Sequence, residues 1–446
     1  MRLRITHAAV AAVWLIALPA GAADLLEIYR LAQSRDAVYA GARASFNAAQ
    51  EKIPQGRAGL LPQASVSANS TFNDRTVTFR LPNATASAAQ FNSNAITVSI
   101  TQPLFRRQSW IALEQARSQV DQAEAQFTQA AQELGLRVAQ AYFDVLLAQD
   151  NVALANAQKT AIGQQLEQAK RNFEVGTATI TDTHEAQARY DLTVAQGIAA
   201  VNDLEVRRRT LAQIINQPAP PLAPLSPRLG LKPPEPASID NWVDEARRAN
   251  PQVRASEAGL QVATQTVQRN RAGHYPTVDA VASYQESGQG AGVSGVQSPG
   301  FDSRSTAVGV QLAIPLYQGG LVNSQVREAI ANEERARQDL ENARRTAELN
   351  ARQAYLGVTS GLAQVQALQA ALRSSESQVE STRLGQQVGV RTQVDVLNAQ
   401  QQLYTARRDL AQARYNYVVS LLQLKAAIGQ LGEDDVAQVN TWLGER

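Results

Sequence analysis

VGVRTQVDVLNAQQQL, residues 388–403, is a glycine break followed at once by a helical pattern. Gly389 interrupts one long helical stretch, and Thr392 stands at the N-cap position of the next, with Asp395 in its first turn. Two helices joined by so short a turn run back along each other. The stretch therefore predicts a helical hairpin with its tip at Gly389.

A second copy of this tip lies in the first half of the chain, around Gly176. At the tip, Val175, Gly176, Thr179 and Asp182 correspond to Val388, Gly389, Thr392 and Asp395. Elsewhere, Arg57, Ala58, Gly59 and Pro62 correspond to Arg271, Ala272, Gly273 and Pro276. In the same way Pro103 and Leu104 correspond to Pro315 and Leu316, and Ala141 and Tyr142 to Ala354 and Tyr355. The spacing between partners drifts by only one residue either way, so each half carries the same elements in the same order. We predict two tandem structural repeats.

The chain divides into five predicted segments. They are a signal peptide at 1–22, a first repeat at 23–217, a connector at 218–238, a second repeat at 239–430 and a C-terminal tail at 431–446. Eight prolines in residues 218–236 predict an extended connector that runs along a surface. The tail is expected to be loosely held.

The N-terminal segment at 1–22 indicates export. Arg2 and Arg4 precede a short apolar run and the small residues Ala20, Gly21 and Ala22, the order of a secretory signal. The alternative, a membrane anchor, is disfavoured because the apolar run is too short to span a bilayer. Loss of the two arginines brings the 42 basic side chains level with the 40 acidic ones, which gives no indication of nucleic acid binding. The chain has no cysteine, which excludes disulfides, thiolate metal sites and a lipid attached through cysteine.

Four strands are predicted, two in each half. They cover residues 64–81, 96–105, 278–284 and 305–317, with a glycine-rich loop at 287–300. In the second strand Ile96, Val98 and Ile100 alternate with threonine and serine, which is typical of a strand with one apolar and one polar face.

Long helices account for most of the remaining chain. A helix is expected at 24–59, with Leu25, Ile28, Leu31 and Ala32 on one face, and a short one at 239–249. Residues 106–173 contain no proline and would form a helix about 100 Å long, with a heptad seam through Leu113, Val120, Phe127 and Leu134. After the tips the chain returns as helices at 181–216 and 394–429.

Two β-hairpins cannot close a barrel, and open strand edges cannot lie in lipid. Copies of the chain would therefore have to share one barrel. Two copies give eight strands with a filled interior, whereas three give twelve and leave a lumen. The predicted fold class is an α+β membrane protein, a trimeric twelve-stranded β-barrel that continues into a long periplasmic α-helical barrel of coiled-coil hairpins.

The runs GVRTQVDVLNAQQQLYTARRDLAQARYNY and IPLYQGGLVNSQV, with the TD of ITDTHEAQARYD, resemble the TolC family of outer membrane channels over nearly the whole mature chain. The resemblance implies a homotrimer in outer membrane lipid that extends into the periplasm. It also implies a passive exit channel of a tripartite efflux pump, a type I secretion system or both. The expected partners are a periplasmic adaptor (membrane fusion) protein and an inner membrane RND or ABC transporter, and no cofactor is expected.

The resemblance also assigns a gate at the tip. The matching positions are Arg391, Thr181, Asp182, Gln386, Asp395 and Asn398, of which Gln386 replaces a tyrosine and Asn398 an aspartate. In a trimer Asp395 would form a ring of like charges that raises its pKa, with Arg391 four residues earlier on the same face. The alternative is that Asp395 merely stabilises a helix N-terminus. The tip residues Gly176, Thr179, Gly389 and Thr392 are expected to dock the adaptor.

Two other classes of protein compete with a channel. An enzyme is disfavoured because His184 and His274 lie in different elements and the sequence lacks HExxH, GxSxG and a phosphate loop. The heptads alone would permit a periplasmic coiled-coil adaptor without a membrane barrel. The four alternating strands argue against that second alternative.

Overall fold

The structure is a computed structural model that describes residues 22–78, 80, 87–226, 230–291 and 299–444. The predicted signal peptide before Ala22, part of the glycine-rich loop and part of the connector lie outside these residues. The chain forms two compact units. Unit 1 takes the described residues of Met1–Gly41, Ala130–Asn250 and Glu348–Arg446, and unit 2 those of Ala42–Gln129 and Pro251–Ala347.

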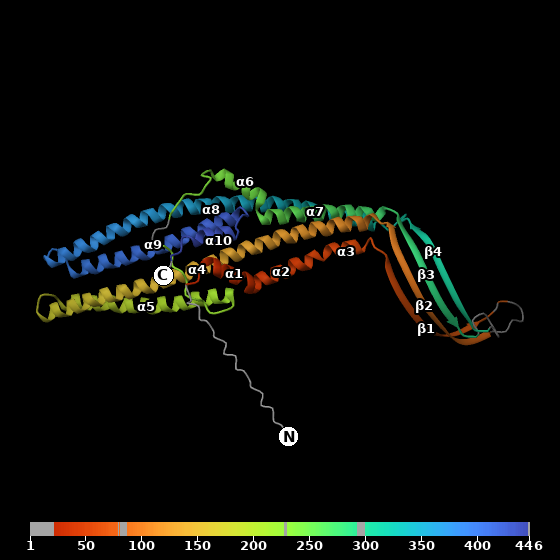
Figure 1. The fold of residues 1–446 in the computed structure, drawn as a ribbon, viewed down its shortest axis with the longest axis horizontal. Coiled ribbons are helices and arrows are strands. Elements are labelled where there is room, and N and C mark those ends of the chain that lie inside the picture. Colours follow the sequence, from red (N-terminus) through yellow and green to blue (C-terminus); the bar gives the residue numbers. More distant parts are fainter. Residues whose placement is uncertain (1–21, 79, 81–86, 227–229, 292–298, 445–446) are drawn as a thin grey trace, which may run out of the picture. The chain divides into compact units, whose positions relative to one another are not determined.

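Unit 2 contains an antiparallel sheet whose strand order follows the sequence (Figure 1). Its strands are β1 (Gln63–Val77), β2 (Ser87–Phe105), β3 (Thr277–Gln289) and β4 (Phe301–Ala313). Two predicted strands were too short, because β2 begins well before Ile96 and β3 runs into the predicted glycine-rich loop. Apart from Phe91, these added residues are small or polar on both faces, so the alternation that marks a strand disappears while backbone pairing continues. The predicted strands 64–81 and 305–317 run past the ends of β1 and β4.

Four long helices confirm the predicted hairpins. They are α4 (Arg107–Glu174), α5 (Ile180–Ile215), α8 (Leu321–Gln387) and α9 (Gln393–Ala427), with α4 and α8 contributing to both units. Within unit 2 the predicted seam of α4 includes Phe127, whose ring stacks on Phe46 with centroids 5.4 Å apart. None of the helices in the described ranges carries a stretch apolar enough to cross a lipid bilayer.

The first predicted helix is three helices. They are α1 (Leu25–Arg35), α2 (Ala37–Gln50) and α3 (Lys52–Ala58). Asp36 causes the first break, because its backbone is extended and its carboxylate accepts a hydrogen bond from the Tyr39 amide at 2.7 Å. Arg137 pairs with the same carboxylate at 3.0 Å, so the break is held in place.

The second half begins with α6 (Ile239–Ala249), as predicted, and continues with α7 (Pro251–Arg271) and the short 3-10 helix η1 (Ala272–His274), which were not predicted. The connector is tied to unit 1 by buried side chains and tyrosine hydroxyls. Leu222 and Ala223 are buried, the Tyr142 hydroxyl donates to the Ala223 carbonyl at 2.8 Å, and Tyr417 donates to that of Lys232 at 2.6 Å.

The prediction of a loose C-terminal tail is wrong. Residues Glu433–Asn440 form α10, whose Val436 and Val439 are buried. Asn440 accepts a hydrogen bond from the Leu25 amide at 3.0 Å and donates one to Asp24 at 2.8 Å. A helix as short as α10 has too brief a pattern to be predicted from sequence. Its hydrogen bonds with Leu25 of α1 and with Asp24, the N-cap of α1, hold it in place.

Candidate functional site

The sheet of unit 2 has two unlike faces. The exposed apolar face carries Val66, Ile96, Val98, Ile100, Val308, Val310 and Leu312, with Val308 82% exposed. The opposite face carries Ser65, Ser67, Thr97, Ser99, Thr101, Ser283, Gln285 and Gln311, placed there by strand alternation and register. An exposed apolar face opposite a hydroxyl- and amide-rich face fits a wall between lipid and water.

Both edges of this sheet are open within the described residues. β1 pairs with β2 and β4 pairs with β3, so the outer side of each edge strand keeps free backbone donors and acceptors. Such edges are templates for pairing with another chain.

An ion pair lies at the junction of β2 and α4. The Arg106 guanidinium donates to both carboxylate oxygens of Asp279, at 2.8 and 2.6 Å, and Asp279 is only 8% exposed. Sequence reasoning missed this pair, because the two residues lie in different repeats and only the sheet register brings them together. The duplicated positions are Gln318 and Ser65, which are both uncharged.

Both hairpin tips have the predicted caps. In the second tip Thr392 is the N-cap of α9, its amide donates to Asp395 at 2.9 Å, and the Asp395 amide donates to the Thr392 hydroxyl at 3.2 Å. In the first tip Thr179 and Asp182 repeat this capping box at 3.0 and 3.3 Å.

A glycine makes each turn possible. Gly176 and Gly389 have φ angles of 78° and 80°, in the left-handed region where a side chain would be strained. All four predicted docking residues, Gly176, Thr179, Gly389 and Thr392, are exposed at these tips.

Within one chain the cap controls the charge of Asp395. Hydrogen bonds from the Thr392 backbone and hydroxyl lower the pKa of Asp395, and the charge of Arg391 acts in the same direction. This is opposite to the raised pKa expected of a ring, and it matches the helix N-terminus alternative. The ring effect concerns several chains and stays a prediction.

The other predicted gate residues do not meet within one chain. Arg391 precedes α9, so it does not share a helical face with Asp395 as expected from the sequence. Its side chain lies over Gly385, where an added Cβ would come within 2.7 Å of the Arg391 Cγ. Thr181 is exposed in the first turn of α5. In the described part of the chain the Arg391 guanidinium has no hydrogen-bond or ion-pair partner.

Within one chain Gln386 and Asn398 make contacts between helices. Gln386 donates to Gln393, and Gln393 donates to the Gln165 side chain of α4 at 2.7 Å. Asn398 accepts a hydrogen bond from Arg189 of α5 at 3.0 Å. Gln165, Gln393 and Arg189 were missed, because amide and guanidinium contacts depend on the register between helices, which the sequence does not reveal.

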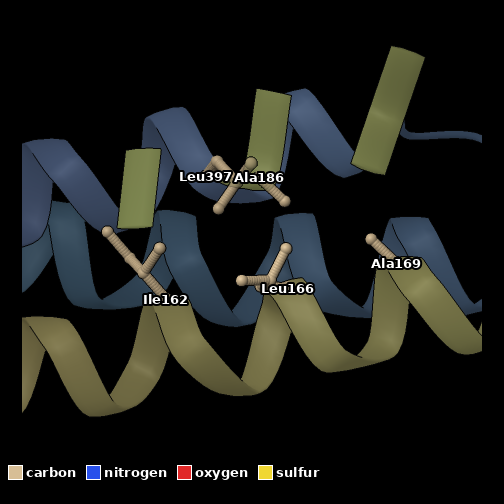
Figure 2. Close-up of a cluster of buried hydrophobic side chains, with 5 residues drawn as sticks. All are labelled: Ile162, Leu166, Ala169, Ala186 and Leu397. Atoms are coloured by element: carbon tan, nitrogen blue, oxygen red, sulfur yellow. The ribbon is translucent and has the colours of Figure 1, made fainter. Parts of the chain in front are cut away.

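A small apolar cluster lies between the two hairpins near the tips. Figure 2 shows Ile162, Leu166 and Ala169 of α4 facing Ala186 of α5 and Leu397 of α9. Gln158 adds a hydrogen bond to Gln401 at 2.8 Å. α9 is therefore fixed on the α4–α5 hairpin by both apolar packing and amide pairs. Across the described ranges no cluster of histidine and acidic residues is arranged to hold a metal ion.

The sequence matches the family model described as "Outer membrane efflux protein" twice, at residues 28–217 and 242–430. It is 34% identical to the outer membrane protein TolC of Vibrio cholerae, over 95% of this chain and 94% of that protein. It is 33% identical to the alkaline protease secretion protein AprF of Pseudomonas aeruginosa, over 94% of this chain and 87% of that protein.

Solved structures show the same fold. The outer membrane protein VceC of Vibrio cholerae has a TM-score of 0.76 at 19% identity, covering 91% of this chain and 96% of that one. The CmeC outer membrane channel of Campylobacter jejuni has a TM-score of 0.77 at 16% identity, covering 100% and 98%. The predicted α+β channel fold is thereby confirmed.

The two family matches cover the two predicted repeats, and the relatives are outer membrane and secretion proteins. They support an outer membrane channel for efflux or type I secretion and disfavour the adaptor alternative. The chain belongs to the outer membrane efflux protein family.

Proposed function

We propose that three copies of this chain form one passive channel through the outer membrane, which carries cargo for an efflux pump or a type I secretion system. The observation that carries this proposal is the four-stranded sheet, with one apolar face, one polar face and two open edges. Twelve strands in a ring would leave no edge in lipid and would turn the polar faces toward a lumen. The channel itself carries out no chemical step.

The helical edges also favour several copies. Exposed apolar or small residues recur at heptad spacing on α5, at Leu192, Ala199 and Val206, and on α8, at Leu349, Leu356, Ala363 and Ala370. Stripes with this spacing are typical of coiled-coil seams. Each stripe lacks a covering helix in the described part of unit 1, and a neighbouring copy would cover it.

Purification from the outer membrane tests the assembly. We expect heat-modifiable trimers that conduct ions across a planar lipid bilayer. A monomer in detergent, or a soluble periplasmic protein that never conducts, would overturn the proposal in favour of the adaptor alternative.

We place the gate at the tips, with Arg391 linking to Thr181 and Asp182 of another hairpin and with Asp395 and Asn398 facing the pore. The Arg391 guanidinium has no hydrogen-bond or ion-pair partner within the described chain, and Asp182 uses only its Oδ2 atom in the cap. Gln386 lacks the hydroxyl of a tyrosine, so its link is weaker. A ring of three Asp395 carboxylates would favour cations and oppose the cap's effect on the pKa.

Single-channel recording tests the gate. Arg391→Ala and Asp182→Ala should each increase the open time, because each removes one end of the proposed link. Arg209→Ala is the control, since Arg209 is an exposed α5 arginine paired with Glu205. Open times unchanged from the control would remove Arg391 and Asp182 from the gate.

We propose that the tips at Gly176, Thr179, Gly389 and Thr392 dock a periplasmic adaptor that recruits an inner membrane RND or ABC transporter. Because the chain has no cysteine, Thr177→Cys and Val390→Cys give single cross-linking sites beside the tips. We expect both to capture the same adaptor in cells, whereas Gln366→Cys on α8 should not. Capture from Gln366→Cys alone would contradict tip docking.

A further inference from the structure

Because the two repeats of the chain are duplicates, a contact between repeats within one chain predicts the equivalent contact between two neighbouring chains. In unit 2, α7 packs against two helices, α8 and α4. Toward α8, Asn270 donates to the Gln325 carbonyl at 3.2 Å, and a Cβ built on Gly273 would lie 3.4 Å from Val322.

The duplicated helix α3 repeats this first contact on α4. A Cβ built on Gly59 would lie 3.6 Å from Ser109, and one on Gly56 would lie 3.4 Å from the Ala112 carbonyl. The repeat spacing is one residue longer from α3 to α7 than from α4 to α8. With this spacing, Gly59 with Ser109 corresponds to Gly273 with Val322, and Gly56 with Ala112 corresponds to Asn270 with Gln325. The two repeats therefore match residue by residue at this contact.

The second contact of α7, toward α4, has no counterpart within the described chain. There Gln115 donates to the Thr266 hydroxyl at 2.7 Å, and Arg269 donates to Gln115 at 2.9 Å. With the same spacing, Thr266 corresponds to Lys52 in the other repeat, and Gln115 corresponds to Glu328. Lys52 and Glu328 are exposed and opposite in charge, and neither has a partner in the described residues.

A close approach at a glycine maps in the same way. Gly273 also lies near α4, with its built Cβ 3.4 Å from the Gln108 side chain. The duplicated pair is Gly59 with Leu321, and Leu321 is 56% exposed in one chain. A leucine that is exposed in one chain can be covered by a neighbouring helix where a glycine on that helix leaves room for its side chain.

We propose that α3 of one copy packs on α8 of the neighbouring copy, with Lys52 facing Glu328 and Leu321 lying over Gly59. The inference rests on the proposed assembly of several copies and specifies its interface. The partner that covers this surface of α3 is a second copy of the chain. The equivalent surface of α7 is covered by α4, and the duplicate of α4 is α8.

The strands give the register of the same interface. The pairs Gln63 with Thr101 and Thr277 with Ala313 are equivalent in the two hairpins, which extends the repeat spacing to the strands. The β2–β3 pair Thr101 with Val281 then predicts Ala313 of one copy opposite Ser67 of the next. Next to the strand-to-helix junction of that seam the counterparts of Arg106 and Asp279 are neutral, and the charged pair predicted between the helices is Lys52 with Glu328.

Cross-linking in the cysteine-free chain tests the proposal. Full-length Lys52→Cys/Glu328→Cys, treated with a short bis-maleimide in outer membranes, should run as a covalent trimer on a denaturing gel, and neither single variant should. Lys52→Cys/Gln338→Cys is the control, because Gln338 lies about 15 Å further along α8. Reversing one charge, with Lys52→Glu or Glu328→Lys, should lower the temperature at which trimers separate, and the double reversal should recover it.

Light scattering in detergent distinguishes failure of this interface from failure of the proposed trimer. Trimers that do not cross-link at these positions, or that show no recovery in the double reversal, would overturn this interface and leave the assembly standing. Monomers in every variant and in the unaltered chain would overturn the assembly itself.

Discussion

The two strand-to-helix junctions of this chain are copies that differ in charge. The junction of β2 with α4 carries Arg106, bound to the buried carboxylate of Asp279, whereas the duplicated positions hold Gln318 and Ser65. The first pair joins two hairpins that the chain itself connects. The second pair does not meet within the described chain and would meet only between chains of the proposed assembly. In that assembly, divergence after duplication would leave a charged contact within the chain and a neutral one between chains.

The largest effect is expected from breaking the internal junction. Arg106→Ala leaves Asp279 buried without its cation, which should cost about 2 to 3 kcal/mol of stability. Gln318→Ala removes only a neutral side chain and should stay within about 0.5 kcal/mol. Urea unfolding of the purified protein measures both. Equal losses would show that the ion pair does not distinguish the junctions.

The next comparison is between two duplicated tyrosines. The Tyr142 hydroxyl is buried and donates to the Ala223 carbonyl at 2.8 Å, with the Ala23 carbonyl at 3.2 Å, whereas Tyr355 is less buried and donates to the Ala237 carbonyl. Tyr142→Phe should cost about 1 to 2 kcal/mol, because a buried carbonyl loses its donor, and Tyr355→Phe should cost less. Thermal melting in detergent would contradict this if the order were reversed.

Tyr142 also predicts a pH dependence. Burial raises the pKa of Tyr142, so the folded chain keeps this phenol neutral at a pH where the unfolded chain, with a pKa of about 10, has ionised it. The stabilisation is complete below about pH 10 and is lost as the pH rises further. Tyr142→Phe should reduce the fall in stability between neutral and alkaline pH, and an unchanged slope would assign it to other groups.

The smallest effects are expected at the two tips, whose capping boxes are nearly identical. Thr392→Ala and Thr179→Ala should each cost about 1 kcal/mol locally and speed hydrogen exchange of the amides in the first turn of α9 or α5. The Thr392 variant should also raise the pKa of Asp395, because that carboxylate loses the hydroxyl donor. If only one variant speeds exchange, the two tips are not equivalent.

The tips and long helices could be predicted from sequence because their signals are local. A glycine with positive φ, a threonine cap and an aspartate three residues later act within one turn, so Gly389, Thr392 and Asp395 suffice to place the hairpin. The strand ends could not be predicted, since around Asn94 small and polar residues lie on both faces and only backbone pairing reveals the strand.

The proposed gate rests on resemblance, which suggests Arg391, Asp182, Gln386 and Asn398. Within one chain Gln386 is joined to Gln393 and Asn398 to Arg189. These partners depend on how α9 lies against α4 and α5. No periodicity in a single helix carries that information.

The docking of α10 on α1 sets an order of folding. Leu25 and Asn440, at opposite ends of the described chain, are joined by a hydrogen bond, and Arg30 pairs with Glu433. Synthesis makes α1 first and α10 last, so unit 1 stays incomplete until nearly the whole polypeptide has emerged. A molecule truncated before residue 433 would therefore leave the face of α1 uncovered, which marks unfinished chains as targets for proteolysis before they reach the membrane.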